Sequence, residues 1–307
     1  MNLYLSSLFL LYALLGLFIQ STVTKAQQQP ISSSNGDGIA SYAMSCNRSD
    51  LSHLRELAHS PGTRTIMYIM AHDKASIDIA NQFRSCDMDW MHIMTLPINK
   101  YFESNMYSTF FPLHQATWSQ YDYILTATYK TLHRNLLPRY MPLQSIEEMT
   151  SKLMVAKESQ YDIVPFLRDT EEMMRTSVKY HTIWFFRAWN VLLLALGYSR
   201  EVIIESYALH AFYRNVYLIT PTTLHNLCTF MQQAMIIAEQ NTTVQALLQK
   251  DARYVLGTAR TARKVFGTPY YQLHPFIFER LPTFYLFATQ AKVCLESTGP
   301  CKMNYKG

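Results

Sequence analysis

Charged residues are scarce in this sequence of 307 residues. Together they make up 16% of the chain, whereas about 25% is usual for a soluble protein. Apolar residues reach 49%, so the chain can bury a sizeable core, and intrinsic disorder is excluded. The formal net charge is only +5 and the basic residues are scattered, which does not indicate nucleic-acid binding.

The sequence also lacks the short motifs of several enzyme classes. It contains no Walker loop, no GxGxxG, no GxSxG and no HExxH. The usual signatures of phosphoryl transfer, dinucleotide binding, serine hydrolysis and zinc proteolysis are therefore missing.

Five cysteines are too few for a disulfide scaffold and have no metal-ligand spacing. Cys294 and Cys301 bracket a short loop that contains Gly299 and Pro300, and we predict a disulfide between them. Cys228 lies in an apolar helical pattern and is expected to be a buried thiol.

Residues 1–26 predict a secretory signal. An uncharged apolar stretch is followed by polar residues and by a small-residue cleavage site that ends at Ala26. The stretch also reaches the lower limit for spanning a bilayer, so an uncleaved membrane anchor is the alternative. Residues 27–63 form a polar linker and N-terminal extension, and glycosylation acceptors at Asn47 and Asn241 are compatible with the secretory pathway, either in the ER or Golgi lumen or after secretion.

After the linker, the period of the apolar residues alternates between two and 3.6, which indicates an α/β fold. We predict strands at residues 65–70, 123–128 and 215–220, and an edge strand at 161–166 because its proline cannot donate to a sheet. The predicted helices are 73–83, 145–158, 171–196, 199–209, 222–239 and 275–290, and Pro282 should kink the last. The C-terminal half is therefore expected to be rich in helices.

The apolar segment 183–194 raises the question of a membrane span. Because Arg187 and Asn190 lie in the middle of it, we interpret it as a buried core helix.

Several polar groups are candidates for chemistry. Asp87 and Asp89 form a DxD tripeptide, a pattern that holds Mn²⁺ or Mg²⁺ on a diphosphate in many nucleotide-sugar transferases. They do not follow an apolar strand, so we interpret the tripeptide as a solvated turn and keep a metal site as the alternative. His72 and Asp73 follow the first strand, where open α/β sheets bind ligands, and a helix N-cap is the alternative for Asp73.

Two further groups of polar residues follow later in the chain. Lys130, His133 and Arg134 come after the second predicted strand and form a basic cluster suited to a diphosphate, although surface charges need no such explanation. Glu279 and Arg280 interrupt the most apolar helix of the C-terminal region, where a structural ion pair is the alternative to a functional role.

Five motif segments occur in a fixed order: 71–73 (AHD), 102–104 (FES), 121–123 (YDY), 212–215 (FYRN) and 270–282 (YYQLHPFIFERLP). This set resembles an uncharacterised group of lumenal proteins, which is in turn similar to bacterial capsular-polysaccharide glycosyltransferases. Those enzymes have a nucleotide-sugar-binding α/β domain and end in a similar Glu-Arg-Leu helix. The resemblance spans residues 64–290 and leaves 291–307 as a C-terminal tail.

The resemblance implies a GT-A-like fold that transfers a sugar from a nucleotide donor to a hydroxyl of a glycan or protein acceptor. It would place Asp73 beside the nucleotide and Lys130 near the diphosphate. It would place Asn215, His274, Glu279 and Arg280 around the sugar or the acceptor. Glu279 is our first choice for a general base or for a group that orients the acceptor hydroxyl.

The chain departs from the bacterial pattern at two points. It lacks a strand-borne DxD, and a lysine and a histidine stand where the bacterial relatives tend to carry paired arginines. Metal dependence and catalytic activity are therefore open, and a non-catalytic secreted or lumenal binding protein with the same fold is the alternative. Contact with a membrane is expected only if the N-terminal segment is uncleaved.

Overall fold

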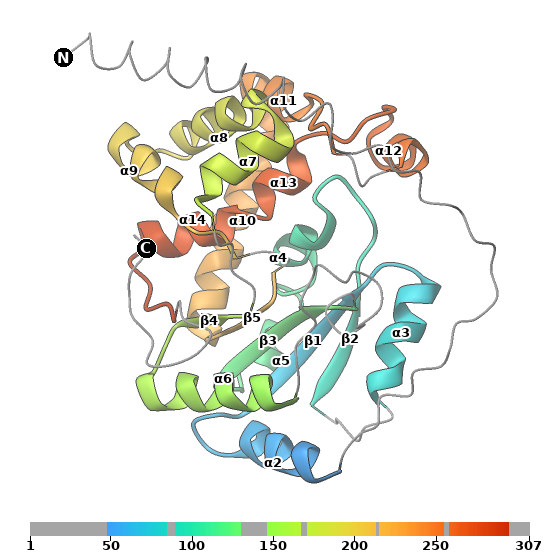
Figure 1. Cartoon of the computed structure of the whole chain (residues 1–307), viewed down its shortest axis with the longest axis vertical. Helices are drawn as coiled ribbons and strands as arrows, with labels where there is room; N and C mark the ends of the chain where they lie inside the picture. Colours follow the sequence, from blue (N-terminus) through green and yellow to red (C-terminus); the bar gives the residue numbers. More distant parts are fainter. Residues whose placement is uncertain are drawn as a thin grey trace. The chain divides into compact units, whose positions relative to one another are not determined.

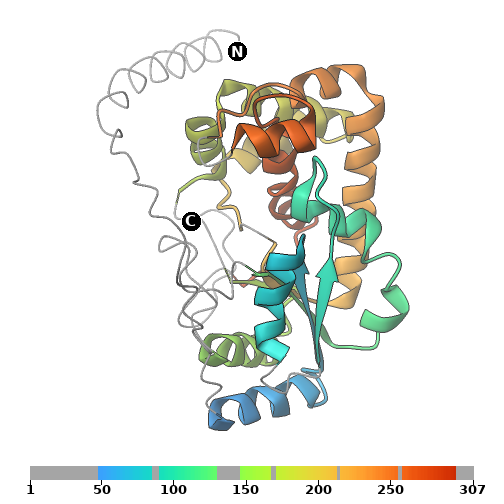
Figure 2. The ribbon, with the colours of Figure 1, turned by 90° about the vertical axis from the view of Figure 1, so that its right-hand side faces the viewer.

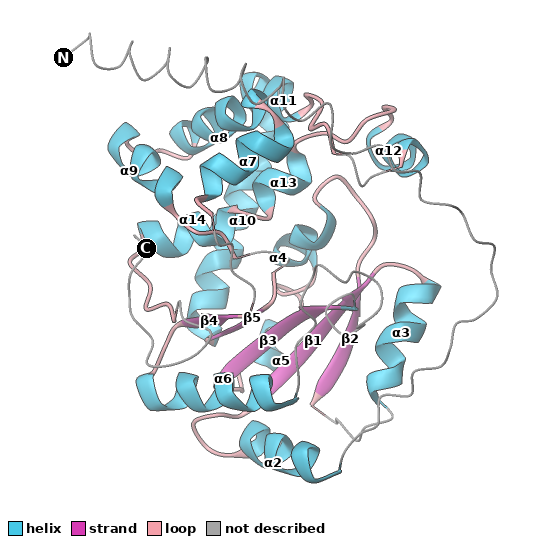
Figure 3. Ribbon diagram, in the orientation of Figure 1, coloured by secondary structure: helices cyan, strands magenta, loops and turns pink. Residues whose placement is uncertain are grey.

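The computed structural model describes residues 48–84, 90–129, 146–166, 171–212, 215–254 and 258–294. A five-stranded mixed sheet lies among helices, in the strand order β2-β1-β3-β5-β4 (Figure 1). The strands are β1 (Thr65–Ala71), β2 (Met91–Thr95), β3 (Tyr123–Thr128), β4 (Ile163–Pro165) and β5 (Tyr217–Ile219). The predicted α/β class is confirmed, and Figure 3 shows how helices predominate outside the sheet.

The helices of the first half are α2 (Arg48–His59), α3 (Lys74–Arg84), η1 (Phe102–Asn105), α4 (Met106–Thr109), α5 (Gln115–Trp118) and α6 (Ile146–Ser159). Those of the second half are α7 (Met173–His181), α8 (Ile183–Ala195), α9 (Arg200–Glu205), η3 (Ser206–Ala208), α10 (Pro221–Gln240), α11 (Thr242–Leu248), α12 (Ala259–Phe266), α13 (His274–Phe278) and α14 (Leu281–Ala288).

The strand directions bring several chain segments to one edge of the sheet. β1 runs parallel to β2 and β3, whereas β5 runs antiparallel to β3 and to β4. The carboxyl ends of β1, β2, β3 and β4 therefore lie at the same edge as the amino end of β5. We call this the carboxyl edge, and it is where open α/β sheets bind their ligands.

Each face of the sheet is covered by a hydrophobic core, as the alternation along β1 shows. Ile66, Tyr68 and Met70 join the core that includes residues of α4, α5 and α10. Met67 and Ile69 join the core that includes residues of α2, α3 and α6. All seven residues of β1 are buried, which explains why its sequence is a continuous apolar run and not an alternating one. Figure 2 shows the sheet between these helices.

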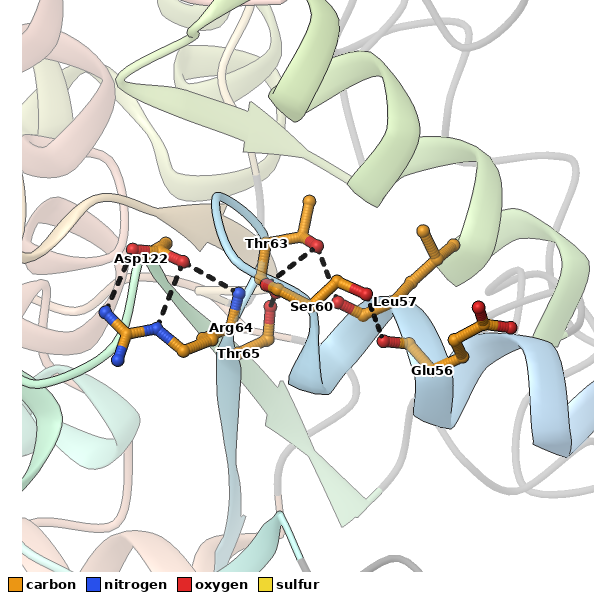
Figure 4. Close-up of polar contacts among 7 residues, drawn as sticks. All are labelled: Glu56, Leu57, Ser60, Thr63, Arg64, Thr65 and Asp122. Carbon is orange, nitrogen blue, oxygen red and sulfur yellow. Dashed lines mark hydrogen bonds and ion pairs between the residues drawn. The ribbon is translucent and has the colours of Figure 1, made fainter.

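The amino end of β1 is fixed to β3 by hydrogen bonds around one arginine (Figure 4). Asp122 Oδ2 accepts a hydrogen bond from the backbone N–H of Arg64 (2.9 Å), and its carboxylate lies 3.4 Å from the guanidinium. The Arg64 carbonyl accepts from the backbone N–H groups of Asp122 and Tyr123. Asp122 therefore sets the register in which β1 and β3 begin.

Most predicted elements are confirmed. The bounds of β1, β3, α3, α6, β5 and α10 lie within two residues of those predicted. The predicted helix 199–209 is shorter, because α9 ends at Glu205 and a 3₁₀ turn, η3, follows it. β4 is shorter than predicted and lies at the end of the sheet, as its proline indicated. Among the described helices none is long and apolar enough to cross a membrane. Helix α8 instead buries Phe185, Trp189 and Leu193, so the prediction of a core helix is confirmed.

One continuous helix was predicted for residues 171–196, and this is wrong because the structure has two helices there, α7 and α8. Thr182 has φ 73° and ψ 169°, which ends α7, and its hydroxyl accepts a hydrogen bond from the N–H of Trp184 at the start of α8. A positive φ is rare for a β-branched residue. Gly197, with φ 90°, follows the end of α8 as predicted.

The predicted helix 275–290 is also two helices. Pro282 lies in the first turn of α14, where its missing N–H is not required, so it starts a helix instead of kinking one.

The core extends beyond the predicted boundaries at residues 64 and 290. Leu54 and Ala58 of α2 are buried against the sheet. At the other end, the N–H of Cys294 donates to the carbonyl of Ile163 (3.1 Å), so residues after 290 cover the outer side of β4. An exposed strand edge is prone to unwanted pairing, and this segment protects it.

Two cysteines fall within the described residues. Cys228 is a buried free thiol, as predicted, and burial raises its pKa to about 12. Cys294 is disulfide-bonded, but its partner lies outside the described residues. Its pairing with Cys301 therefore stays a prediction.

Candidate functional site

Asp73 lies at the carboxyl edge, directly after β1, and caps helix α3. Its Oδ1 accepts hydrogen bonds from the N–H (2.8 Å) and the hydroxyl (2.7 Å) of Ser76. The Ser76 hydroxyl in turn accepts from the backbone N–H groups of His72 and Asp73. Hydrogen bonds from Ser76 hold the pKa of Asp73 below its ordinary value. The N-cap that was the alternative for Asp73 is thus present, and the exposed carboxylate remains accessible to a ligand.

His72, which follows β1, contacts the chain segments that follow β2 and β3 at the carboxyl edge. Its Nε2 lies 3.6 Å from Oε1 of Glu103, which belongs to η1 after β2. Its ring lies edge-on to Tyr129, which follows β3, with ring centroids 6.4 Å apart. Sequence reasoning chose Asp73 over His72 as a site residue, although both follow the same strand.

Asn215 lies at the same edge because β5 runs antiparallel to β3. It is buried and has φ 53°, a conformation that asparagine tolerates better than most residues. Its Oδ1 accepts a hydrogen bond from the hydroxyl of Tyr107 (2.9 Å), and its backbone carbonyl accepts from Thr126 Oγ1. Asn215 therefore ties α4 to the sheet, which is a structural role.

His274 opens α13 and is buried. Its ring lies edge-on to Tyr101 at 5.8 Å, and among the described residues neither ring nitrogen has a hydrogen-bond partner. Burial, together with the positive charge of Lys100, lowers the pKa of His274 to about 3. The imidazole is therefore neutral at physiological pH and has no exposure through which it could contact a ligand in this conformation.

A small polar network lies beside His274. Glu239, near the end of α10, binds the ammonium of Lys100 at 2.6 and 2.7 Å and accepts a hydrogen bond from the hydroxyl of Tyr101. Burial raises the pKa of Glu239, but the hydrogen bonds from Lys100 and Tyr101 outweigh it and lower the pKa overall. This network fixes the chain after β2 against α10 and α13, and sequence reasoning did not find it.

Glu279 and Arg280 follow α13 and contact each other. Oε2 of Glu279 lies 3.5 Å from Nη1 of Arg280, and the two side chains are 27% and 4% exposed. The same Nη1 donates to the carbonyl of Phe276 (2.6 Å), and the guanidinium lies over the ring of Phe185 at 5.3 Å. The ion pair named as the structural alternative is present, and Glu279 also keeps some access to solvent.

His181, at the end of α7, lies close to this pair. Its ring stacks on Phe276 with centroids 4.0 Å apart. Burial and the charge of Arg280 lower its pKa to about 3. Arg280 is thus packed among aromatic rings and a neutral histidine.

The structure brings four of the five motif segments together. Segments 71–73 and 102–104 meet through the contact of His72 with Glu103, and segment 102–104 meets 270–282 through the stacked rings of Phe102 and Tyr271. Segment 212–215 lies at the same edge, because it precedes β5 and the carbonyl of Asn215 accepts from Thr126 Oγ1 of β3. The N–H of Phe212 also donates to Oγ1 of Thr283 (3.1 Å), the residue that follows segment 270–282. Segment 121–123 lies at the opposite edge, where Asp122 binds Arg64.

Five candidate residues cannot be placed, because they lie outside the described residues: Asp87, Asp89, Lys130, His133 and Arg134. Within the described ranges, no group of three or more His, Cys, Asp or Glu side chains is arranged to hold a metal ion. No protein-family model matches the chain, and neither a curated protein nor a solved structure matches it.

Proposed function

We propose that this chain is a glycosyltransferase-like protein of the secretory pathway with a GT-A-like fold. It would transfer a sugar from a nucleotide donor to a hydroxyl of a glycan or protein acceptor. The observation that carries the proposal is the meeting of four motif segments at the carboxyl edge of the sheet. These segments are far apart in the sequence, and they meet where an open α/β sheet binds a nucleotide.

The transfer requires a base on the acceptor and a stabilised leaving group. The acceptor oxygen forms a bond to the anomeric carbon, and the bond between that carbon and the diphosphate oxygen breaks. The acceptor proton goes to a carboxylate, and the nucleoside diphosphate leaves with the bonding electron pair. Glu279 is our candidate for the base because it is partly exposed and lies in the most specific motif segment. Arg280, in contact with Glu279, would orient it.

The remaining candidates take supporting roles in this proposal. Asp73 would contact the nucleotide through its exposed carboxylate, and Lys130 would lie near the diphosphate. Asn215 and His274 are buried, so they would shape the sugar or acceptor pocket through the elements they hold. A divalent Mn²⁺ or Mg²⁺ ion would neutralise the diphosphate if Asp87 and Asp89 bind one.

A second candidate function is a non-catalytic binding protein that keeps the same fold. Two observations favour it: Asp73 is engaged as a helix cap, and His274 is fully enclosed. Both functions share the nucleotide site and differ in turnover.

The variant Glu279→Gln tests the catalytic assignment. It keeps the shape of the side chain and removes its charge, so donor binding and thermal stability should survive while turnover falls about 100-fold or more. If Glu279 serves only as the partner of buried Arg280, the variant should instead lose about 3 kcal/mol or more of stability. A variant that melts many degrees lower and loses nucleotide affinity in parallel would refute the catalytic role.

A matched control is Glu158→Gln, an exposed residue near the end of α6. It removes one carboxylate from a helix that carries no motif segment, so binding, turnover and melting temperature should stay at wild-type values. If the wild type binds the nucleotide-sugar donor but neither transfers nor hydrolyses its sugar, the binding protein is favoured over the enzyme.

A further inference from the structure

Helix α12 carries three exposed basic side chains on one face. Arg260, Arg263 and Lys264 are spaced i, i+3 and i+4, so they project from the same side of the helix. The opposite side carries the buried Ala262 and the half-buried Phe266. The helix is therefore attached by its apolar side and presents its basic side outward.

The chain segment that contains α12 supplies no acidic side chain to pair with this basic face. The sequence contains no aspartate or glutamate between Asp251 and Glu279. Within the described part of the chain, the side chains of Arg260, Arg263 and Lys264 form no hydrogen bond or ion pair. Like charges at this spacing repel each other and weaken a helix, and an anion bound between them would relieve the repulsion.

A cluster of aromatic rings and one electrostatic interaction place α12 at the carboxyl edge. The ring of Phe266 lies 6.1 Å from that of Phe102 in η1, and both rings pack on Tyr271. In addition, Lys264 is within Coulombic range of Asp73, whose pKa is lowered mainly by Ser76 and further by this ammonium. The basic face thus lies beside the residue that we place next to the nucleotide.

We propose that α12 binds the diphosphate of the nucleotide donor through Arg260, Arg263 and Lys264. This inference rests on the proposed function and specifies which side chains would neutralise the leaving group. Guanidinium groups match phosphate oxygens in pairs, and the ammonium adds a point charge. Cations fixed at this position stabilise the charge that develops as the nucleoside diphosphate departs.

The test uses the full chain and a triple variant, Arg260→Gln with Arg263→Gln and Lys264→Gln. All three side chains are exposed, so folding should be unaffected, and thermal melting checks this. If the triple variant unfolds, the single variant Lys264→Gln takes its place.

A matched control removes the same charge elsewhere, through Lys157→Gln, Arg175→Gln and Arg200→Gln. These exposed residues lie on α6, α7 and α9. Calorimetry measures the binding of nucleoside diphosphates, of the corresponding nucleosides and of inorganic pyrophosphate, with EDTA present so that only side chains supply cations.

We expect the wild type and the control to bind the same nucleoside diphosphate, and the α12 triple variant to bind it about 100-fold more weakly or worse, since charge-assisted hydrogen bonds are lost. The nucleoside should bind all three proteins equally. Nucleoside diphosphate binding at wild-type affinity by the triple variant, or an equal loss in the control, would overturn the proposal and leave the proposed function intact.

The measurement with pyrophosphate distinguishes a failure of this proposal from a failure of the proposed function. Pyrophosphate binding that depends on α12, without any binding of nucleotides, supports an anion site on this helix and removes the donor assignment. Absence of binding of both pyrophosphate and nucleoside diphosphates to the wild type overturns the proposal.

Discussion

The buried histidines make the stability of this protein depend on pH in a defined direction. In the folded chain the pKa of His274 and that of His181 are about 3, against an ordinary value of 6.5. Folding therefore favours the neutral imidazoles, and between these two values the unfolded chain binds more protons than the folded one. The stabilisation is fully present above pH 6.5 and is lost as the pH falls toward 3.

The size of the effect follows from linkage. Between pH 7 and pH 5 each unfolded imidazole goes from about one-quarter protonated to almost fully protonated, while its folded counterpart takes up almost no proton. Integrating the difference gives a loss of about 2 kcal/mol of unfolding free energy for each histidine. This is a large part of the stability of a typical domain.

The variant His274→Leu isolates one of the two contributions. Within the described residues neither nitrogen of His274 has a hydrogen-bond partner, so leucine removes no hydrogen bond. At pH 7 the variant should therefore differ from the wild type by about 1 kcal/mol or less. On going to pH 5 it should lose about 2 kcal/mol less than the wild type, because the titrating group is gone.

Urea denaturation at pH 7, 6 and 5 measures this difference directly. The control His225→Leu makes the same substitution at an exposed histidine of α10 and shows how far the substitution alone moves the curves. The groups that face His274 are Lys100 and Glu239, and neither is altered in the variant. Parallel stability curves for wild type and His274→Leu between pH 7 and 5 would refute the reasoning.

Two further predictions concern the ends of the fold. Asp122→Ala removes the acceptor for the Arg64 backbone N–H and should lower the unfolding free energy, measured in urea, by about 1 to 2 kcal/mol. Asp122→Asn keeps an acceptor and should lose less. Equal losses in the two variants would contradict this and show that the charge of Asp122 dominates. Cys294 and Cys301 should appear in one linked peptide when the unreduced protein is mapped, and a linked peptide that joins Cys294 to another cysteine would contradict this.

The sequence predicted the elements whose local pattern agrees with their final environment. β1 and β3 are continuous runs of β-prone residues because both of their faces are buried. Helix α3 could be predicted because Asp73 precedes it and caps it. In these cases propensity, capping and burial all favour the same structure.

The missed elements have weak or misleading local signals. β2 is a short edge strand in which Met91 and Met94 are buried and His92 is exposed, so no apolar run marks it. Thr182 interrupts a helical pattern that is continuous in the sequence, and the break depends on a backbone conformation that threonine rarely adopts.

The candidate site was predictable only in part. Asp73 could be placed at the carboxyl edge from the sequence, because it follows a predicted strand of an α/β sheet. The network of Lys100, Tyr101 and Glu239 joins residues far apart in the chain, and no spacing rule links them. The basic face of α12 could have been found from its i, i+3, i+4 spacing, but its position beside Asp73 depends on tertiary packing.

The most direct test of the central claim is the binding of a panel of nucleotide sugars to the wild-type chain, with and without Mn²⁺, followed by calorimetry and by thermal melting. The account predicts that at least one nucleotide sugar binds, that its nucleoside diphosphate competes for the same site, and that saturating ligand raises the melting temperature. If no nucleotide sugar or nucleoside diphosphate binds at millimolar concentration, with or without the metal, the proposed donor site is contradicted.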